Sequence, residues 1–197
     1  MIRDLAGFAR AAGGTLQGGN AAFGPVASDS RTLEAGALFV ALTGEHFDGH
    51  EFVAQAAARG AAGAVVARPV AAAVAQVVVP DVLGALSRFA NAWRRDFAGT
   101  VVGITGSNGK TTVKEMTGAI LGTFGPCLAT RGNLNNHIGV PLTLARLDAT
   151  HRHAVIEMGA NHLGEIAQLA AICEPDVGLV INAGPAHLEG FGGIEGV

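Results

Sequence analysis

Thr100-Val-Val-Gly-Ile-Thr-Gly-Ser-Asn-Gly-Lys-Thr-Thr112 is the stretch that decides the fold of this chain. Its β-branched start predicts a strand, residues 106–109 predict a glycine-rich loop, and Lys110 begins a predicted helix. In this order, backbone N–H groups of the loop and of the helix N-terminus surround phosphate oxygens. The lysine then reaches the terminal phosphates, and a neighbouring hydroxyl holds Mg²⁺. The stretch therefore predicts a site for a nucleoside triphosphate.

The loop departs from the strict phosphate-loop pattern G-x-x-x-x-G-K-T. Ile104 stands where that pattern has its first glycine, and Gly103 and Gly106 flank the position. The loop therefore resembles a variant of the phosphate-binding cradle. The residues predicted to bind the nucleotide are Gly106, Ser107, Asn108, Gly109, Lys110, Thr111 and Thr112.

The composition excludes several classes of protein. The 197 residues carry a net charge of −3 and no basic stripe, which argues against nucleic acid as a partner. The most apolar tract, residues 61–79, is interrupted by Arg68 and Pro69, so it is not a membrane span. The N-terminus lacks the apolar core of a secretory signal, and Cys127 and Cys173 lack metal-ligand spacing. We therefore expect a cytoplasmic protein with reduced, buried thiols.

The order of the predicted elements divides the chain into two α/β units, residues 1–81 and 82–197. The first unit alternates helices predicted at 4–12 and 52–59 with strands at 37–42, 63–67 and 75–79. The second alternates helices at 83–97, after Lys110, at 139–147 and at 163–173 with strands at 101–105, 127–130, 153–158 and 177–182. This alternation predicts mostly parallel sheets. Because the chain ends in a loop after its last strand, we expect the second sheet to be truncated.

Polar residues follow three strands of the second unit. Lys110 and Thr111 follow the first strand, Glu157 ends another, and His187 lies in the loop after the last. Ligands of open parallel sheets bind at the carboxyl ends of the strands, so we expect these residues to share one site. Thr111 and Glu157 offer the oxygen ligands that Mg²⁺ prefers. Two alternatives stay open: Glu157 satisfied by a neighbouring helix, and His187 as a capping or packing histidine.

A second polar cluster contains Asn133, Asn135 and Asn136. Turn chemistry alone explains three carboxamides in four residues. The functional alternative is a hydrogen-bonding rim for a polar substrate. Asn161 and Glu165 come just before or at the start of a predicted helix, where they are expected to face the same cleft.

Two polar loops flank the strand predicted at 37–42. Ser28-Asp-Ser-Arg-Thr32 precedes the strand, and Thr43-Gly-Glu-His-Phe-Asp-Gly-His50 follows it. Turn chemistry explains each loop alone, whereas together they predict ligand binding. The predicted substrate-binding residues here are Ser30, Arg31, Thr43, Gly44, His46 and Asp48. His46 and His50 have the spacing of zinc ligands, but Gly49 disfavours a helix between them, so zinc is not expected.

Taken together, these stretches resemble the Mur ligases, the ATP-dependent amide ligases of peptidoglycan precursor synthesis. The signal shared across that family is Thr105-Gly-Ser-Asn-Gly-Lys-Thr-Thr112. Asn133-Leu-Asn-Asn-His-Ile-Gly-Val-Pro141 and Glu157-Met-Gly-Ala-Asn-His-Leu-Gly-Glu-Ile166 resemble the member that adds D-alanyl-D-alanine to UDP-N-acetylmuramoyl-tripeptide. Asp29-Ser-Arg31 and Asp48-Gly-His50 resemble the domain that binds the uridine-containing substrate.

The resemblance implies a mechanism and a role for each residue. ATP phosphorylates the terminal carboxylate of the tripeptide, and the amine of the dipeptide attacks the resulting acyl phosphate. Lys110 neutralises phosphate charge, Thr111 and Glu157 hold one Mg²⁺, and His187 helps to hold a second. The substrates UDP-MurNAc-tripeptide and D-Ala-D-Ala would be bound partly by Asn133, Asn135 and Asn136, with residues 1–81 binding the UDP-muramoyl peptide.

The family also carries a third domain and a carbamylated lysine beyond the histidine loop, whereas no lysine follows Lys114 in this chain. We therefore expect the chain to be inactive alone, and we expect a monomer. Two alternatives stay open. One is a family member that adds diaminopimelate or lysine, and the other is a nucleotide-binding or UDP-sugar-binding module without ligase activity.

Overall fold

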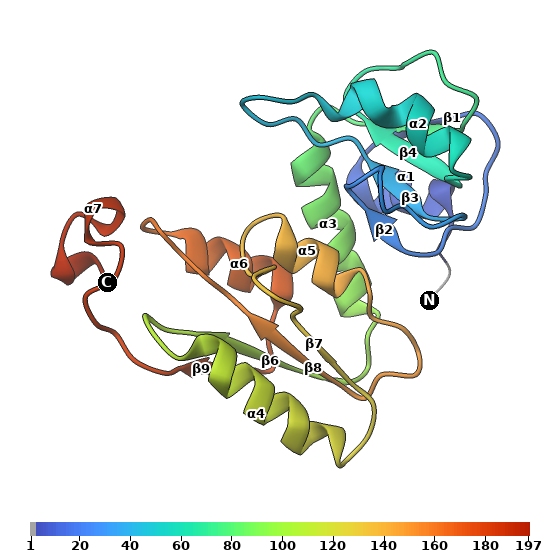
Figure 1. Cartoon of the computed structure of the whole chain (residues 1–197). Helices are drawn as coiled ribbons and strands as arrows, with labels where there is room; N and C mark the ends of the chain where they lie inside the picture. The colour runs from blue at the N-terminus through green and yellow to red at the C-terminus, as the bar shows by residue number, and fades with distance from the viewer. Residues whose placement is uncertain (1–2) are drawn as a thin grey trace. The chain divides into compact units, whose positions relative to one another are not determined.

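The computed structural model describes residues 3–197 and forms two compact units (Figure 1). The first unit runs to Ala92 and the second begins at Trp93, so the division falls within helix α3 (Val82–Arg95). The sequence places the boundary after residue 81, where this helix is about to begin. Met1 and Ile2, which belong to the segment predicted to lack a secretory signal, lie outside the described residues.

The sheet of the first unit has five strands in the order β1-β5-β4-β3-β2. They are β1 (Thr15–Gln17), β2 (Val26–Ala27), β3 (Leu38–Val40), β4 (Gly63–Val66) and β5 (Gln76–Val78). All neighbours are parallel except β1, which runs antiparallel to β5. The three predicted strands are confirmed. The sequence missed β1 and β2 because two or three residues are too short to show an apolar pattern.

Helices cover this sheet. Helix α1 (Leu5–Ala12) is capped by Asp4, whose carboxylate accepts from the Gly7 N–H at 2.6 Å. A 3₁₀ turn, η1 (Gly49–Phe52), leads into helix α2 (Val53–Ala58). Phe39 on β3 packs in a cluster with residues of α2 and β4. The Phe8 ring on α1 lies 4.6 Å from that of Phe89 on α3. Burial on both faces explains why β3 and β4 read as continuous apolar runs.

The second unit has four parallel strands in the order β7-β8-β6-β9. They are β6 (Thr100–Thr105), β7 (Cys127–Ala129), β8 (His153–Glu157) and β9 (Val177–Val180). The register pairs Ile104 of β6 with Glu157 of β8. The carboxyl ends of β6 and β8 therefore lie side by side, and the predicted mostly parallel sheet is confirmed.

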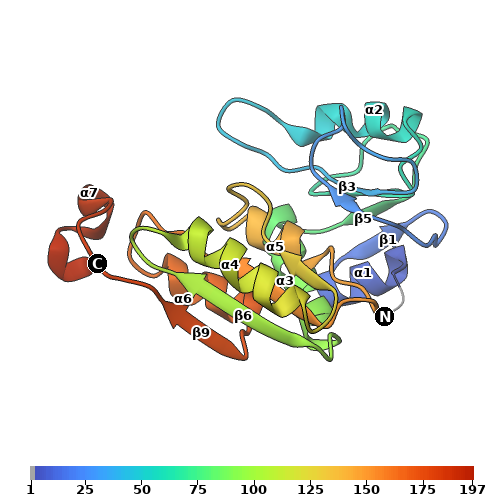
Figure 2. The ribbon, with the colours of Figure 1, turned by 60° about the horizontal axis from the view of Figure 1, so that its bottom comes forward.

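Helix α4 (Lys110–Gly122) covers one face of this sheet, and α5 (Gly139–Leu144) and α6 (Glu165–Cys173) pack together on the other (Figures 1 and 2). The strand β9 forms an edge with exposed side chains, and the chain continues through α7 (Leu188–Phe191) and the 3₁₀ turn η2 (Ile194–Gly196). Two residues at the end of α3 are anchored in this unit. Trp93 Nε1 donates to the Leu147 carbonyl at 2.9 Å, and the Arg94 guanidinium pairs with Asp176 at 2.9 Å.

Two further expectations concern membrane-spanning helices and the two cysteines. Within residues 3–197, every helix is too short or too polar to cross a membrane. Both cysteines are free: Cys173 is buried, and Cys127 is half-buried. Burial raises the pKa of the Cys173 thiol to about 12, so this thiol is inert as a nucleophile.

Candidate functional site

The glycine loop joins the end of β6 to the start of α4. Gly106 has φ 145° and Gly109 has φ 80°, backbone conformations that side chains other than glycine rarely adopt. A Cβ atom on Gly106 would also lie 3.1 Å from the backbone of Asn182. Ile104, which breaks the strict pattern, is fully buried in β6. The position that lacks the expected glycine is therefore part of the core, and the loop begins after it.

The loop presents its backbone at the start of α4. Gly109 is the N-cap of this helix and has no side chain that caps it. The first N–H groups of a helix have no partner within the helix, so those of Lys110, Thr111 and Thr112 point out of its N-terminus toward the loop. Lys110 Nζ donates to the carbonyl of Gly106 at 2.6 Å and to that of Ser107 at 3.3 Å. An ammonium has three donors, so Lys110 keeps one for a ligand.

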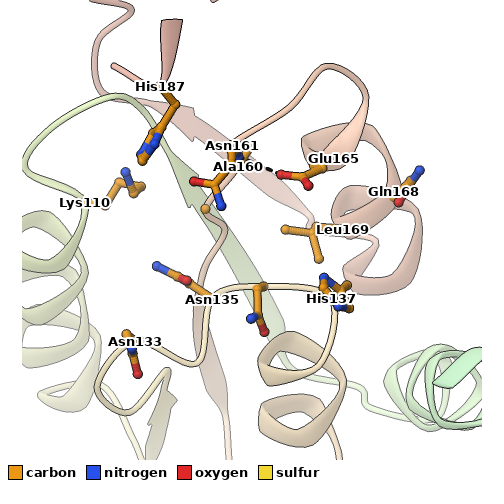
Figure 3. A pocket seen from close by; sticks show the side chains of 12 residues that line it. Lys110, Asn133, Asn135, His137, Ala160, Asn161, Glu165, Gln168, Leu169 and His187 are labelled. Atoms are coloured by element: carbon orange, nitrogen blue, oxygen red, sulfur yellow. Dashed lines mark hydrogen bonds between the residues drawn. The ribbon is translucent and has the colours of Figure 1, made fainter. Parts of the chain in front are cut away.

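A cavity of about 310 Å³ opens beside the loop (Figure 3). Its walls come from the start of α4, the asparagine loop before α5, the segment after β8, the first turns of α6 and the loop after β9. Lys110 and His187 point toward one another at its rim (Figure 3). The cavity also holds Asn161 and Glu165, and the Asn161 N–H donates to the Glu165 carboxylate at 2.6 Å. This backbone hydrogen bond holds the pKa of Glu165 below its usual range.

Glu157 lies buried at the end of β8, with 2% of its surface exposed. Its Oε1 accepts from Asn135 Nδ2 at 2.8 Å, whereas its Oε2 has no hydrogen-bond partner among the described residues. Lys114 Nζ lies 4.0 Å from Oε2 and donates instead to the Thr130 carbonyl at 2.8 Å. A buried carboxylate oxygen without a partner is unfavourable unless a cation or a donor joins it. The carboxylate is thus hydrogen-bonded by a loop through Oε1, and the lysine of helix α4 lies at ion-pair distance from Oε2.

The other predicted metal ligands are exposed. Thr111 lies in the first turn of α4, and His187 precedes α7 with φ 50°. The His187 side chain makes no capping hydrogen bond, so the capping alternative is not what the structure has. Within residues 3–197, no three His, Cys, Asp or Glu side chains form a metal-binding group. The donors for a cation here are consequently one buried carboxylate, a hydroxyl and an imidazole.

The asparagine cluster divides by role. Asn136 Oδ1 accepts from the N–H groups of Ile138 and Gly139 at 3.1 and 2.9 Å, which is turn chemistry at the start of α5. Asn135 instead holds Glu157. Asn133, which is exposed, lines the cavity together with both of them. The turn and rim interpretations therefore both apply, to different residues of one loop.

Sequence reasoning assigned no role to Lys114 or Asn182. Lys114 is 1% exposed although it is charged, and it lies one helical turn after Lys110. Asn182 follows β9 and pairs with the backbone of Asn108 in the glycine loop. Two signals in the sequence could have identified them: Lys114 falls on the inner face of its helix, and Asn182 ends an apolar strand.

In the first unit, a hollow of about 480 Å³ lies beside the loop at residues 28–31. Ser30 and Arg31 line it, together with the aromatic rings of Phe39, Phe47 and Phe52, which the sequence reasoning did not single out. The Arg31 guanidinium donates to both Asp29 oxygens, at 3.0 and 2.8 Å. These hydrogen bonds lower the pKa of Asp29 to about 2. Phe47 is 56% exposed, so the hollow offers an accessible aromatic face.

The loop after β3 is held by a network of its own. His50 Nε2 accepts from the Ala67 N–H at 2.8 Å, so its Nδ1 carries the proton and donates to Asp48 at 2.6 Å. Asp48 also pairs with Arg68 at 2.6 Å and accepts from the Thr43 hydroxyl. Thr43, Gly44, His46 and Asp48 do not line the hollow. The assignment of these four residues to substrate binding stays a prediction.

Comparison with known proteins matches both units to one family. The model of the Mur ligase middle domain matches residues 104–197, and that of the Mur ligase family catalytic domain matches residues 23–94. The UDP-N-acetylmuramoyl-tripeptide--D-alanyl-D-alanine ligase of Escherichia coli K12 is 50% identical over 184 residues, which are 93% of this chain and 41% of that protein. The ligase of the same name from Bacillus subtilis is 43% identical over 175 residues, which are 87% of this chain and 38% of that protein.

Solved structures agree with these matches. A crystal structure of MurF from Acinetobacter baumannii superposes with a TM-score of 0.93 at 44% identity, covering all of this chain and 44% of that one. MurF from Thermotoga maritima, solved in complex with ADP, superposes at 0.78 with 36% identity over 87% of this chain and 40% of that one. This chain spans about two fifths of the length of the curated relatives it matches. It belongs to the Mur ligase family.

Proposed function

We propose that this chain is part of an ATP-dependent amide ligase that adds D-alanyl-D-alanine to UDP-N-acetylmuramoyl-tripeptide. The observation that carries the proposal is the cavity in which Lys110, the asparagine loop and His187 meet. A phosphate-binding loop, a half-satisfied carboxylate and a carboxamide-lined wall are the parts that phosphorylation of a polar carboxylate substrate requires. The 50% identity to an E. coli ligase of that name supports the choice of substrates.

The loop would bind the triphosphate. Its N–H groups and the N-terminus of α4 surround phosphate oxygens, and Lys110 turns from the loop carbonyls to the terminal phosphates. The backbone of residues 106–112 would change little in this step, because the positive φ angles of Gly106 and Gly109 already set the turn of the loop at the helix N-terminus. Lys110 then acts by neutralising charge as it builds on the transferred phosphoryl group.

The residues around Glu157 fit Mg²⁺. Oε2, which has no hydrogen-bond partner among the described residues, is a buried oxygen donor of the kind that this ion takes, and Thr111 and His187 are the further candidates. When bound, Mg²⁺ supplies charge neutralisation at the phosphates. Asn135 holds Oε1 of Glu157 at 2.8 Å, so the free Oε2 is kept in one orientation. A site with so few protein donors takes its other ligands from the nucleotide and from water.

The reaction would proceed in two steps. A carboxylate oxygen of the tripeptide attacks the γ-phosphorus, the bond to the β-phosphate oxygen breaks, and ADP leaves. The dipeptide amine then attacks the acyl carbon, an amide bond forms, and phosphate and a proton leave. Asn133, Asn135 and Asn136 both donate and accept hydrogen bonds, so they suit the peptide part of the substrate. Positioning is the main contribution of these residues.

The first unit would bind the UDP-linked substrate. The exposed ring of Phe47 and the hollow beside Ser30 and Arg31 suit a flat base with polar edges. We include the loop after β3 in this proposal, so the substrate would also be bound by Thr43, Gly44, His46 and Asp48. We further propose that the protein is a monomer and that it is located in the cytoplasm.

Binding to the 197-residue chain tests the proposal first. In the presence of Mg²⁺ we expect calorimetry to detect binding of ADP, and we expect Lys110→Ala to weaken this binding roughly 100-fold. We also expect it to detect binding of UDP, which Phe47→Ala should weaken. If neither nucleotide binds, the assignment of both sites is wrong.

Activity of the whole ligase is the second test. Phosphate release is measured with UDP-MurNAc-tripeptide and D-Ala-D-Ala, and in parallel with UDP-muramoyl dipeptide and diaminopimelate or lysine. Turnover with the second pair alone would replace the proposal by that alternative. Nucleotide binding without turnover on either pair would favour a binding module.

A further inference from the structure

The phosphate-binding loop is held by a second segment of chain, residues 182–184, which follow β9. The Asn182 carboxamide pairs with the backbone of Asn108: Oδ1 accepts from its N–H at 3.0 Å, and Nδ2 donates to its carbonyl at 3.0 Å. The Asn182 carbonyl accepts from the Ser107 N–H at 3.2 Å. The Ser107 hydroxyl donates to the Gly184 carbonyl and accepts from the Gly184 N–H, both at 2.9 Å.

These contacts differ from those of an ordinary surface loop. The carboxamide of Asn182 satisfies one backbone donor and one backbone acceptor of a single residue, as a neighbouring strand would. Gly106 adds a close approach, since any side chain there would meet the Asn182 backbone at 3.1 Å. The loop therefore continues the pairing between β6 and β9 past the ends of both strands.

The same segment leads to the catalytic candidates. Asn182 and His187 lie five residues apart, and both line a cavity of about 250 Å³ together with Lys110. A displacement of the loop at Asn108 would therefore pull on the segment that carries His187. A displacement of that segment would in turn disturb the loop.

We propose that Asn182 is a positioning residue of the nucleotide site, which holds the phosphate-binding loop in its binding conformation and couples the loop to the segment carrying His187. The predicted effect on nucleotide affinity rests on the proposed nucleotide site, whereas the contacts between Asn182 and the loop do not depend on it. Loss of the carboxamide would leave the loop in many conformations, of which few bind phosphate. Nucleotide affinity would then fall in proportion to the fraction of molecules whose loop has the binding conformation.

Hydrogen exchange of the nucleotide-free chain tests the first part. In Asn182→Ala, the Asn108 amide loses its acceptor, and we expect peptides containing residues 106–109 to exchange roughly tenfold faster. The amides of β6 and β8 should keep their wild-type protection. Unchanged exchange in residues 106–109 would overturn the inference whether or not the chain binds a nucleotide.

A second variant guards against misfolding. Asn182→Asp keeps the shape of the side chain and the acceptor for the Asn108 N–H, but it sets an oxygen against the Asn108 carbonyl. We expect local loosening of residues 106–109 here as well. If both variants instead loosen β6 and β8 as much as the loop, Asn182 is a general structural residue and the inference fails.

Nucleotide binding tests the second part. We expect Asn182→Ala to weaken ADP binding about tenfold, and Asn20→Ala, a matched loss of hydrogen bonds in the first unit, to leave it unchanged. ADP should slow exchange in residues 185–192 of the wild type and not of Asn182→Ala. If the wild type binds ADP, Lys110→Ala binds it far more weakly, and Asn182→Ala matches the wild type, the proposed function stands and this inference falls. If the wild type does not bind ADP, the proposed function falls and the exchange data alone decide.

Discussion

The polar residues of the two units are arranged in opposite ways. In the first unit they satisfy one another: Arg31 binds both Asp29 oxygens, and His50 lies between Asp48 and the Ala67 N–H. In the second unit two charged groups at the predicted nucleotide site, Glu157 and Lys110, keep unused bonding capacity. Glu157 Oε2 has no hydrogen-bond partner among the described residues, and the Lys110 ammonium is held only by loop carbonyls.

This difference separates two uses of polar residues that look alike in a sequence. Satisfied networks fix the shape of a loop, and in the first unit the shape leaves aromatic rings exposed around a hollow. Incomplete groups keep their bonding capacity for a ligand. In the second unit Lys110 lines a polar cavity, and Glu157 is bound by Asn135, another residue that lines it. We therefore expect substitutions of the incomplete groups in the second unit to weaken ADP binding, and substitutions in the first unit's networks to lower stability without changing ADP binding.

Lys110→Ala should have the largest effect. It removes the cation proposed to reach the terminal phosphates, and the loss of its charge-assisted contact to the β-phosphate of ADP, about 3 kcal/mol, corresponds to roughly 100-fold weaker binding. Thermal stability should change little, because the lysine is only half-buried and contacts carbonyls of its own loop. Calorimetry and a melting curve measure the two quantities. A stable variant with wild-type affinity would contradict the contrast between the units.

Glu157→Gln should have the next largest effect. The carboxamide keeps its size and its hydrogen bond with Asn135, but it loses the anionic oxygen that fits Mg²⁺. We expect the variant to bind ADP roughly tenfold more weakly than the wild type in the presence of Mg²⁺, and equally well in EDTA. Titrations with and without Mg²⁺ separate these contributions. Equal losses under both conditions would show that Glu157 acts on the fold and not on the metal.

Much of this arrangement could be predicted from the sequence. The strand, glycine loop and helix at residues 100–122 follow from local pattern, and parallel pairing then brings Glu157 beside the loop. Pairings between distant side chains could not be predicted. Neither the Asn182–Asn108 contact nor the Asp48–His50–Ala67 network has a periodicity, because each depends on how separate loops meet in three dimensions.

His50→Ala should lower the stability of the first unit and leave ADP affinity unchanged. His50 is 5% exposed, and its loss leaves the Ala67 N–H without its acceptor and removes one of the hydrogen bonds to Asp48 Oδ1. A buried donor without an acceptor costs about 2 kcal/mol, so the free energy of unfolding of the first unit should fall by about that amount. Hydrogen exchange in β3 and β4 measures it, while ADP affinity serves as the control. Weakened ADP binding at full stability of β3 and β4 would reverse the assignment of the two units.

Asp29→Asn should have the smallest effect, and its size depends on pH. The hydrogen bonds from Arg31 lower the pKa of Asp29 from its ordinary 3.8 to about 2, so the native state holds this proton less tightly than the unfolded state. The resulting stabilisation is complete above about pH 4 and is lost as the pH falls toward 2. It is small because the side chains of Asp29 and Arg31 are 41% and 81% exposed, which leaves the ion pair screened by water. Urea unfolding should therefore show the variant slightly less stable than the wild type at pH 7 and equal to it near pH 2. The other carboxylates titrate alike in both proteins, so they do not affect the difference in free energy of unfolding between variant and wild type. If that difference persists or grows in acid, the Asp29–Arg31 pair does not hold this loop in solution.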